Sequence, residues 1–79
     1  MQVRVVAFAR VRELLGYGER EVELPASATV EDLWRTIGTP ELDVLRESTR
    51  IARNGTVTEP TAQLADGDEV ALLPPVGGG

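Results

Sequence analysis

The feature that most constrains the fold is one short stretch of helical periodicity that lies between segments with β-strand patterns. Its apolar side chains recur at i, i+3, i+4 and i+7, namely Val30, Leu33, Trp34 and Ile37. Thr29 precedes this stripe and Asp32 follows three positions later, a pattern typical of a helix capping box. The spacing predicts one main helix over residues 30–37, ended by Gly38, with its apolar stripe in the core. Trp34 as a ligand-stacking residue is the alternative interpretation.

Two strands are predicted before this helix. Residues 2–9 are rich in valine and, apart from Arg4, small or apolar on both faces, which favours a strand buried on both sides near the middle of a sheet. Residues 19–24 alternate between apolar and acidic side chains and predict a half-exposed strand that forms a hairpin with the first. Residues 10–15 between them predict a short turn of helix that ends at Gly16.

The second half of the chain predicts shorter elements. Pro40 begins a short helical segment, and the pair Asn54-Gly55 between two β-prone runs is a strong hairpin signal. A turn at residues 66–68 then leads into a last apolar strand over residues 69–73. We expect the first and last strands to lie side by side in a mixed sheet, with the main helix packed on one face. This is an α+β architecture with the outline of a β-grasp, and we assign it to residues 1–74 as one domain.

Composition limits the chemistry that this chain can carry out. It has 79 residues without cysteine or histidine, and all eight basic residues are arginines. The usual nucleophiles, Schiff-base amines and near-neutral general bases are therefore missing, so we expect no self-contained catalytic site. The acidic turn at residues 66–69 offers too few converging ligands for a metal ion, and we assign no metal site. A role in carrying or binding fits this composition better than catalysis.

The charge is acidic overall and uneven along the chain. The formal net charge is −5; residues 1–20 hold four arginines and two glutamates, and the remainder holds four arginines and eleven acidic residues. This balance argues against a protein that binds nucleic acid by neutralising phosphates. It fits either a basic partner surface or an acidic face that is simply solvated.

The sequence predicts neither a targeting segment nor a membrane segment. Arg4 and Arg10 interrupt the N-terminal apolar run, unlike in a signal peptide, and no apolar stretch approaches the roughly 20 residues that span a bilayer. We therefore expect a cytoplasmic protein without a membrane partner.

The end of the chain differs from the rest. Pro74 and Pro75 favour a stiff, extended exit from the last strand. We treat residues 75–79 as an extended, flexible tail made of Pro75, Val76, Gly77, Gly78 and Gly79. It can reach roughly 16 Å, at about 3.3 Å per residue. Such a tail can enter a passage too narrow for ordinary side chains and present a terminal carboxylate that has no Cβ beside it. An idle or disordered glycine end is the alternative.

Several short motifs are spread along the whole chain. They are Phe8-Ala9, Arg12-Glu13 with Gly16, Leu24-Pro25, Thr29-Val30, Asp32-Leu33 and Ala52-Arg53-Asn54-Gly55. The most specific stretch runs through residues 64–71 into Pro-Pro-Val-Gly-Gly-Gly at residues 74–79. On these motifs the sequence resembles the MoaD-type small subunits of molybdopterin synthase, which are ubiquitin-like sulfur carriers. Gly77 stands where that family more often has Ser or Ala.

The resemblance implies that the C-terminal glycine is the working group. The Gly79 carboxylate would be adenylated from ATP by an adenylyltransferase related to ubiquitin-activating enzymes, and a sulfur donor would convert the adenylate to a thiocarboxylate. The tail would then insert into the large synthase subunit, within a heterotetramer, and give its sulfur to cyclic pyranopterin monophosphate. The resemblance also implies that the catalytic side chains belong to the large subunit and that this chain itself binds no cofactor.

Tail contacts alone should bind a partner weakly, because ordering flexible residues costs on the order of 1–2 kcal/mol each. We therefore expect the folded body to contribute an interface near the last strand, with Phe8 and Leu72 as candidate apolar anchors. Packing in the core is the alternative for both side chains.

Other functions stay open on the sequence. One is a sulfur carrier of the same fold that serves tRNA thiolation or thiamine thiazole synthesis, although the Pro-Pro pair before the tail favours the molybdopterin pathway over the thiazole pathway. A second is a ubiquitin-like modifier that is joined through its C-terminus to lysines of target proteins. A third is a β-grasp interaction module whose tail is idle.

Overall fold

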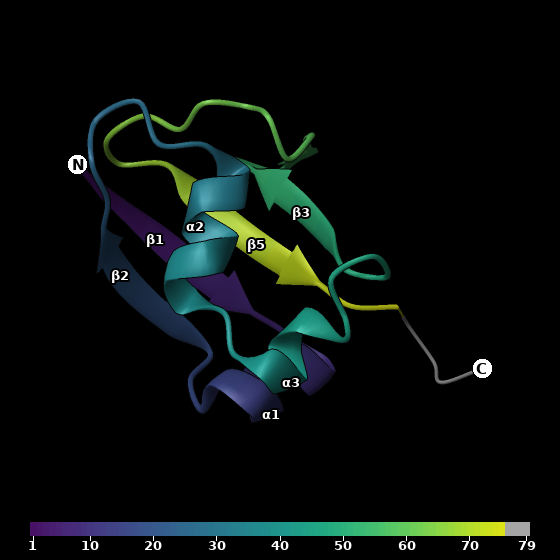
Figure 1. The fold of residues 1–79 in the computed structure, drawn as a ribbon. Helices are drawn as coiled ribbons and strands as arrows, with labels where there is room; N and C mark the ends of the chain where they lie inside the picture. The colour runs from purple at the N-terminus through teal and green to yellow at the C-terminus, as the bar shows by residue number, and fades with distance from the viewer. Residues whose placement is uncertain (76–79) are drawn as a thin grey trace.

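A five-stranded mixed sheet forms the centre of the computed structural model, which describes residues 1–75 (Figure 1). The strands lie in the order β2-β1-β5-β3-β4, with bounds Gln2–Ala7 for β1, Glu19–Glu23 for β2, Arg50–Arg53 for β3, Thr56–Val57 for β4 and Glu69–Leu73 for β5. β1 and β5 are parallel, and the other neighbouring pairs are antiparallel. The predicted adjacency of the first and last strands is therefore confirmed.

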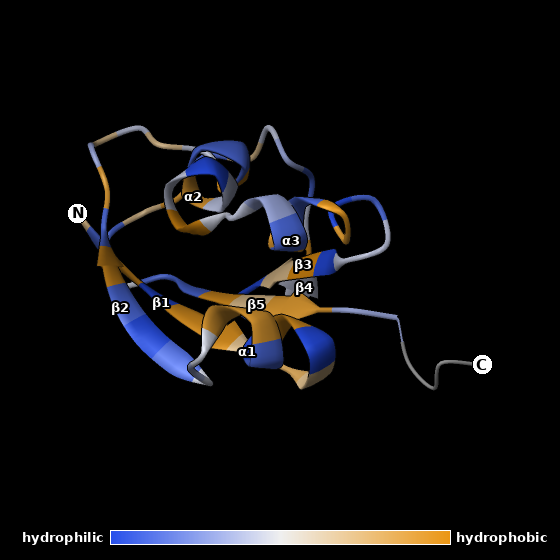
Figure 2. Cartoon of the chain, turned by 60° about the horizontal axis from the view of Figure 1, so that its bottom comes forward, coloured by the Kyte–Doolittle hydropathy of each residue, from blue (hydrophilic) through white to orange (hydrophobic). Residues whose placement is uncertain are grey.

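Within residues 1–75, three helices complete the fold: α1 at Ala9–Leu15, α2 at Val30–Ile37 and α3 at Pro40–Asp43. α2 and α3 lie over one face of the sheet, whereas α1 lies by the ends of β1 and β5 (Figure 2). The predicted α+β architecture, with one main helix on one face of a mixed sheet, is confirmed. No helix among residues 1–75 is long and apolar enough to cross a membrane.

The main helix begins where the capping box predicts. The Thr29 Oγ1 accepts a hydrogen bond from the Asp32 N–H at 3.2 Å, and the Asp32 carboxylate accepts one from the Thr29 N–H at 2.9 Å. Trp34 is buried on the apolar face of α2, and its indole Nε1–H donates to the Asp43 Oδ1 of α3 at 2.9 Å. The core interpretation is therefore correct for Val30, Leu33 and Trp34, and Trp34 also joins the two helices. Ile37, the last residue of the stripe, is only partly buried.

Gly38 ends α2, but not through a left-handed cap. Its φ of −69° is open to any residue. A Cβ at this position would instead lie 2.6 Å from the Trp34 carbonyl oxygen, so a close backbone approach requires the glycine.

β1 is buried on one face only, which corrects the prediction of burial on both. Val3, Val5 and Ala7 lie in the core under the helices, while Gln2 and Arg4 are exposed on the opposite face. The physical reason is the layer order, because α2 and α3 cover only one side of the sheet. The position of β1 in the interior of the sheet, between β2 and β5, agrees with the prediction.

The predicted hairpin joins β3 to β4. Asn54 and Gly55 have φ values of 49° and 86°, the left-handed pair that a tight hairpin turn of this kind requires. This turn also contacts the start of β5, because the Asn54 N–H donates to the Glu69 carbonyl oxygen at 2.8 Å.

Candidate functional site

The candidate site lies where β5 leaves the sheet. β5 is held between β1 and β3, and its last residue, Leu73, is opposite Arg50 of β3. Pro74 and Pro75 follow directly. Because proline has no backbone N–H, neither residue can donate a backbone hydrogen bond to a neighbouring strand. The chain therefore leaves the body at Pro74 and Pro75, beyond the end of β5 (Figure 1). The other tail residues, Val76, Gly77, Gly78 and Gly79, lie outside the described residues.

An open groove of about 1010 Å³ accompanies this exit. We call it the exit groove, and it is lined by Phe8, Ala9, Glu47, Ser48, Arg50, Leu73, Pro74 and Pro75. Residues from four parts of the sequence thus meet at the point where the chain leaves the sheet: the β1–α1 junction, the segment before β3, the start of β3 and the end of β5.

Phe8 supplies the largest apolar side chain of the exit groove. It lies between β1 and α1 and is 45% exposed. The next residue, Ala9, has a positive φ of 48°, so the chain turns sharply from strand to helix at this point. Phe8 therefore lies at the surface near the last strand and not in the core, and its role as an interface anchor stays a prediction.

Leu72 does not fit the anchor assignment. Its side chain is 1% exposed and belongs to the core, so the core interpretation that the sequence left open applies to it. The reason is strand alternation, because Val70 and Leu72 face the helices while Ala71 and Leu73 face the opposite side. Leu73, which the sequence reasoning missed, is the partly exposed leucine of the exit groove.

The polar members of the exit groove were also missed. Arg50 is exposed and lies beside Leu73 in the strand register, and Glu47 and Ser48 come from the turn before β3. Only the pairing of β3 with β5 brings them to the tail, and no local signal in the sequence specifies that pairing. The Ser48 Oγ–H donates to the Leu45 carbonyl oxygen at 3.2 Å.

The chemistry of the exit groove is that of binding. Its lining holds one hydroxyl, one carboxylate and one guanidinium, and the chain has no histidine or cysteine to activate a nucleophile. Among residues 1–75, no group of three or more potential ligand residues is arranged to hold a metal ion. An apolar rim beside Pro74 and Pro75, where the chain leaves the sheet, is suited to contact with another protein.

The acidic turn before β5 has a structural function. Asp68 is buried, and its carboxylate accepts hydrogen bonds from the Arg53 Nε–H at 2.7 Å, the Asn54 Nδ2–H at 2.9 Å and the Ala65 N–H at 2.7 Å. Burial by itself raises the pKa of Asp68, but these hydrogen bonds outweigh it and hold the pKa below its ordinary value. The turn thus fixes the start of β5 against the β3–β4 hairpin.

Comparison with known proteins decides the family. The model of the ThiS family matches residues 5–79, nearly the whole chain. The chain belongs to the ThiS family. This ThiS-family chain is also 40% identical, over 100% of both sequences, to a protein of Chlamydomonas reinhardtii named molybdopterin synthase sulfur carrier subunit.

Three solved structures resemble this ThiS-family member. A putative molybdopterin converting factor, subunit 1, from Pyrococcus furiosus is 36% identical with a TM-score of 0.81, over 96% of this chain and 99% of that one. SAMP1 of Haloferax volcanii, a small archaeal modifier protein, is 28% identical with a TM-score of 0.85 over 100% of both chains. A chain from the complex of subunits 1 and 2 of the molybdopterin-converting factor of Helicobacter pylori is 27% identical with a TM-score of 0.70, also over 100% of both. The ubiquitin-like β-grasp fold is therefore shared with these proteins.

Proposed function

We propose that this chain is the sulfur carrier of molybdenum cofactor biosynthesis and the small subunit of a molybdopterin synthase. The observation that carries the proposal is the full-length similarity to the Chlamydomonas sulfur carrier subunit. Composition supports it, because a chain without cysteine, histidine or lysine fits a carrier whose reactive group is its own C-terminus.

In this proposal the Gly79 carboxylate does the chemistry. An adenylyltransferase partner joins it to the AMP part of ATP, pyrophosphate leaves, and a sulfur donor then displaces AMP to give a thiocarboxylate. The thiocarboxylate sulfur forms a bond to cyclic pyranopterin monophosphate, water then cleaves the acyl–sulfur bond, and Gly79 returns as a carboxylate for another cycle. The catalytic side chains of the synthase would belong to the large subunit, and ATP is bound by the activating partner.

We further propose that the large subunit contacts the exit groove of this chain while the tail of this chain enters the large subunit. Phe8, Leu73 and Pro75 offer apolar surface beside the base of the tail. Ordering each tail residue costs on the order of 1–2 kcal/mol, so contacts of the folded body are needed to offset that cost. The similarity to a chain in the two-subunit complex of Helicobacter pylori supports a large-subunit partner, which we expect in a heterotetramer.

The test is the mass of the C-terminal peptide from protein purified out of its own host. Cleavage after arginine leaves residues 54–79 as one fragment, because Arg53 is the last arginine. Met1, Tyr17 and Trp34 lie outside this fragment, so oxidation of Met or an aromatic residue cannot imitate the exchange of oxygen for sulfur. We expect a fraction with one sulfur in place of one oxygen at Gly79. A peptide that stays unmodified after addition of ATP, an activating enzyme and a sulfur donor would contradict the proposal.

A matched control and a pathway test complete the experiment. A variant with one extra residue after Gly79 keeps the body unchanged and should gain no sulfur. The sulfurated protein should then form molybdopterin from cyclic pyranopterin monophosphate when the large subunit is present. Sulfur transfer to tRNA or to a thiazole precursor instead would assign the carrier to another pathway.

Protein modification is the second candidate function, and the similarity to SAMP1 favours it. It predicts that the residue 54–79 fragment occurs joined through Gly79 to lysines of other proteins in host extracts. The same mass measurement distinguishes the two functions, because a carrier yields a free sulfurated fragment and a modifier yields branched peptides.

A further inference from the structure

β2 lies at the edge of the sheet, and its outer side is unpaired. The Leu24 N–H donates to Met1 O at 2.8 Å, and the Ala7 N–H donates to Gly18 O at 2.9 Å. Because hydrogen-bonded pairs alternate in an antiparallel ladder, the even-numbered residues of β2 bond to β1 and the odd-numbered ones direct their N–H and C=O groups outward. The outward backbone groups of β2 have no hydrogen-bond partner within residues 1–75.

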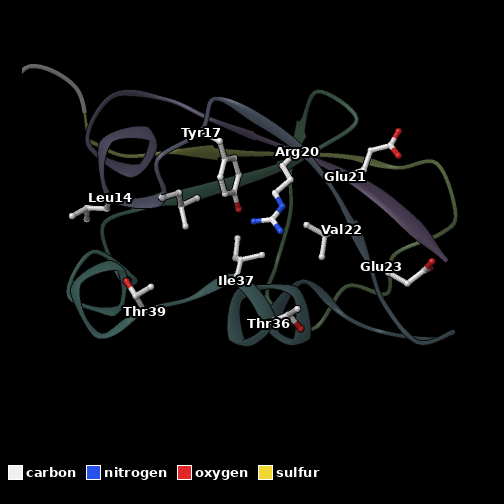
Figure 3. Close-up of a pocket in the computed structure, with 10 residues that line it drawn as sticks. Leu14, Tyr17, Arg20, Glu21, Val22, Glu23, Thr36, Ile37 and Thr39 are labelled. Carbon is white, nitrogen blue, oxygen red and sulfur yellow. The ribbon is translucent and has the colours of Figure 1, made fainter.

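A groove of about 310 Å³ runs between this edge and α2. We call it the β2–α2 groove, and its apolar lining residues are packed on the core but only partly buried: Leu14, Leu15, Tyr17, Val22 and Ile37. Figure 3 shows Tyr17, Arg20 and Val22 pointing toward Ile37, while Glu21 points away. The Arg20 guanidinium lies 5.4 Å from the centre of the Tyr17 ring. An unpaired strand edge thus borders a hollow whose floor is apolar, and its lining also includes polar and charged residues: Arg20, Glu21, Glu23, Thr36 and Thr39.

The opposite face of β2 is acidic. Its three side chains are Glu19, Glu21 and Glu23, all exposed. Glu19 pairs with Arg4 at 3.2 Å and Glu23 pairs with the N-terminal amine at 3.1 Å, whereas Glu21 has no ion pair within the described residues. A strand added to this edge would therefore meet carboxylates on one face. On the other face it would meet Val22, Ile37 and the Arg20 guanidinium, which lies over the Tyr17 ring.

A second copy of this chain does not fit the edge. In any two-fold antiparallel pairing of β2 with itself, the residues with outward backbone groups pair with each other. These residues are the three glutamates, so every register places Glu opposite Glu, and like charges directly opposite are destabilising. The charge pattern selects a basic segment instead.

We propose that the β2–α2 groove binds an extended basic segment of a partner protein, which adds to β2 as an antiparallel edge strand. Alternate aliphatic side chains of the segment enter the groove, and the Lys or Arg side chains between them lie beside Glu19, Glu21 and Glu23. The segment gains backbone hydrogen bonds from the outward groups of β2 and apolar contacts from Val22 and Ile37.

This site is separate from the tail. β2 and the chain exit lie at different sides of the molecule, with β1 between β2 and β5 (Figure 1). The β2–α2 groove and the exit groove share no lining residue. A partner can therefore hold β2 while the tail is engaged elsewhere, and the inference does not rest on the proposed sulfur-carrier function.

The test uses the full chain labelled with ¹⁵N and a synthetic peptide of four Lys-Val repeats with blocked ends. We expect amide shift changes at residues 19–23 and 36–39, slower hydrogen exchange at the Glu21 and Glu23 amides, and weaker binding as salt increases. A peptide of four Glu-Val repeats is the matched control and should not bind. Absence of Lys-Val binding, equal binding of both peptides, or shifts confined to the exit groove would overturn the proposal.

Variants at position 21 separate strand addition from charge. E21P removes an outward N–H but no hydrogen bond to β1, so it should fold and lose at least tenfold in affinity for the Lys-Val peptide. E21Q keeps the N–H and should lose less. E21K keeps the backbone and should reverse the preference toward the Glu-Val peptide, which tests the proposal even if E21P does not fold. Unchanged binding in E21K, or a dimer of the native chain that E21P dissociates, would contradict it.

Discussion

Asp68 shows how much of this fold depends on one carboxylate. It accepts hydrogen bonds from the turn at Ala65 and from both Arg53 and Asn54 of the β3–β4 hairpin. Asn54 in turn accepts from the Glu69 N–H through its Oδ1 at 2.9 Å. The first residues of β5 are thereby fixed in the register that carries the chain to Pro74. Because Asp68 is buried, its charge is stabilised by these donors rather than by water.

We predict that D68N destabilises the protein by about 2 kcal/mol at pH 7, since it removes charge-assisted hydrogen bonds. The folded-state pKa of Asp68 lies below its ordinary value, so this stability is fully present above the ordinary pKa of an unfolded Asp and is lost as pH falls through the lower folded-state pKa. The difference in the free energy of unfolding between the native chain and D68N should therefore become smaller at acid pH. Urea unfolding at pH 7 and near pH 3 measures it.

The control for this prediction is E59Q. Glu59 is exposed, and its side chain has no hydrogen-bond or ion-pair partner within residues 1–75. Its neutralisation should change the free energy of unfolding by less than about 0.5 kcal/mol. If D68N lowers the free energy of unfolding as much near pH 3 as at pH 7, then Asp68 contributes through the shape of its side chain and not through its charge.

At the scale of elements, the sequence predicted the features that depend on residues close to one another in the chain. The bounds of α2 follow from a capping box and an apolar stripe, and the β3–β4 turn follows from Asn54 and Gly55. The sequence did not predict which side chains of β5 face the core. Both faces of this strand are apolar, since its last four residues are Val70, Ala71, Leu72 and Leu73. Only pairing with β1 and β3 decides that Leu72 is core and Leu73 borders the exit groove. The tail residues 76–79 lie outside the described part, so their assignment stays a prediction.

The second prediction concerns Gly38 at the end of α2. A glycine is needed there because a Cβ has no room, and not because of its φ. G38A places a Cβ 2.6 Å from the Trp34 carbonyl oxygen, so the backbone must shift, at a cost of about 1–3 kcal/mol. G18A is the matched control. Its Cβ would meet the Arg12 guanidinium at 3.1 Å, and that flexible end can move away. Thermal unfolding of both variants should show a lower midpoint temperature for G38A alone. An equal decrease in both variants would argue against the close-approach explanation.

At the scale of the whole molecule, the two grooves divide the surface into separate regions. The exit groove gathers residues around the base of the tail at the end of β5, and the β2–α2 groove lies beside the edge strand β2. The body between them holds the core, and the chain has no cysteine, histidine or lysine. Such a layout would suit the proposed sulfur carrier, whose C-terminus would meet successive partners while its body is recognised by them.

The last prediction tests the exit groove as the surface for the proposed large subunit. Phe8 is 45% exposed and borders the base of the tail, so F8A should remove apolar contact with the partner and little core packing. We expect at least a tenfold loss of affinity for the large subunit, because an aromatic side chain at the centre of an interface often carries much of the binding energy. Titration calorimetry with the purified large subunit measures this loss.

V44A is the control that separates this surface from general loss of apolar area. Val44 is 82% exposed and does not line the exit groove, so its truncation should leave the affinity unchanged. Both variants should keep the native free energy of unfolding within about 1 kcal/mol, since neither side chain is in the core. If F8A binds the large subunit as tightly as the native chain, the tail and a surface other than the exit groove must hold the complex together. If V44A weakens binding as much as F8A, the interface extends over the helical layer at α3.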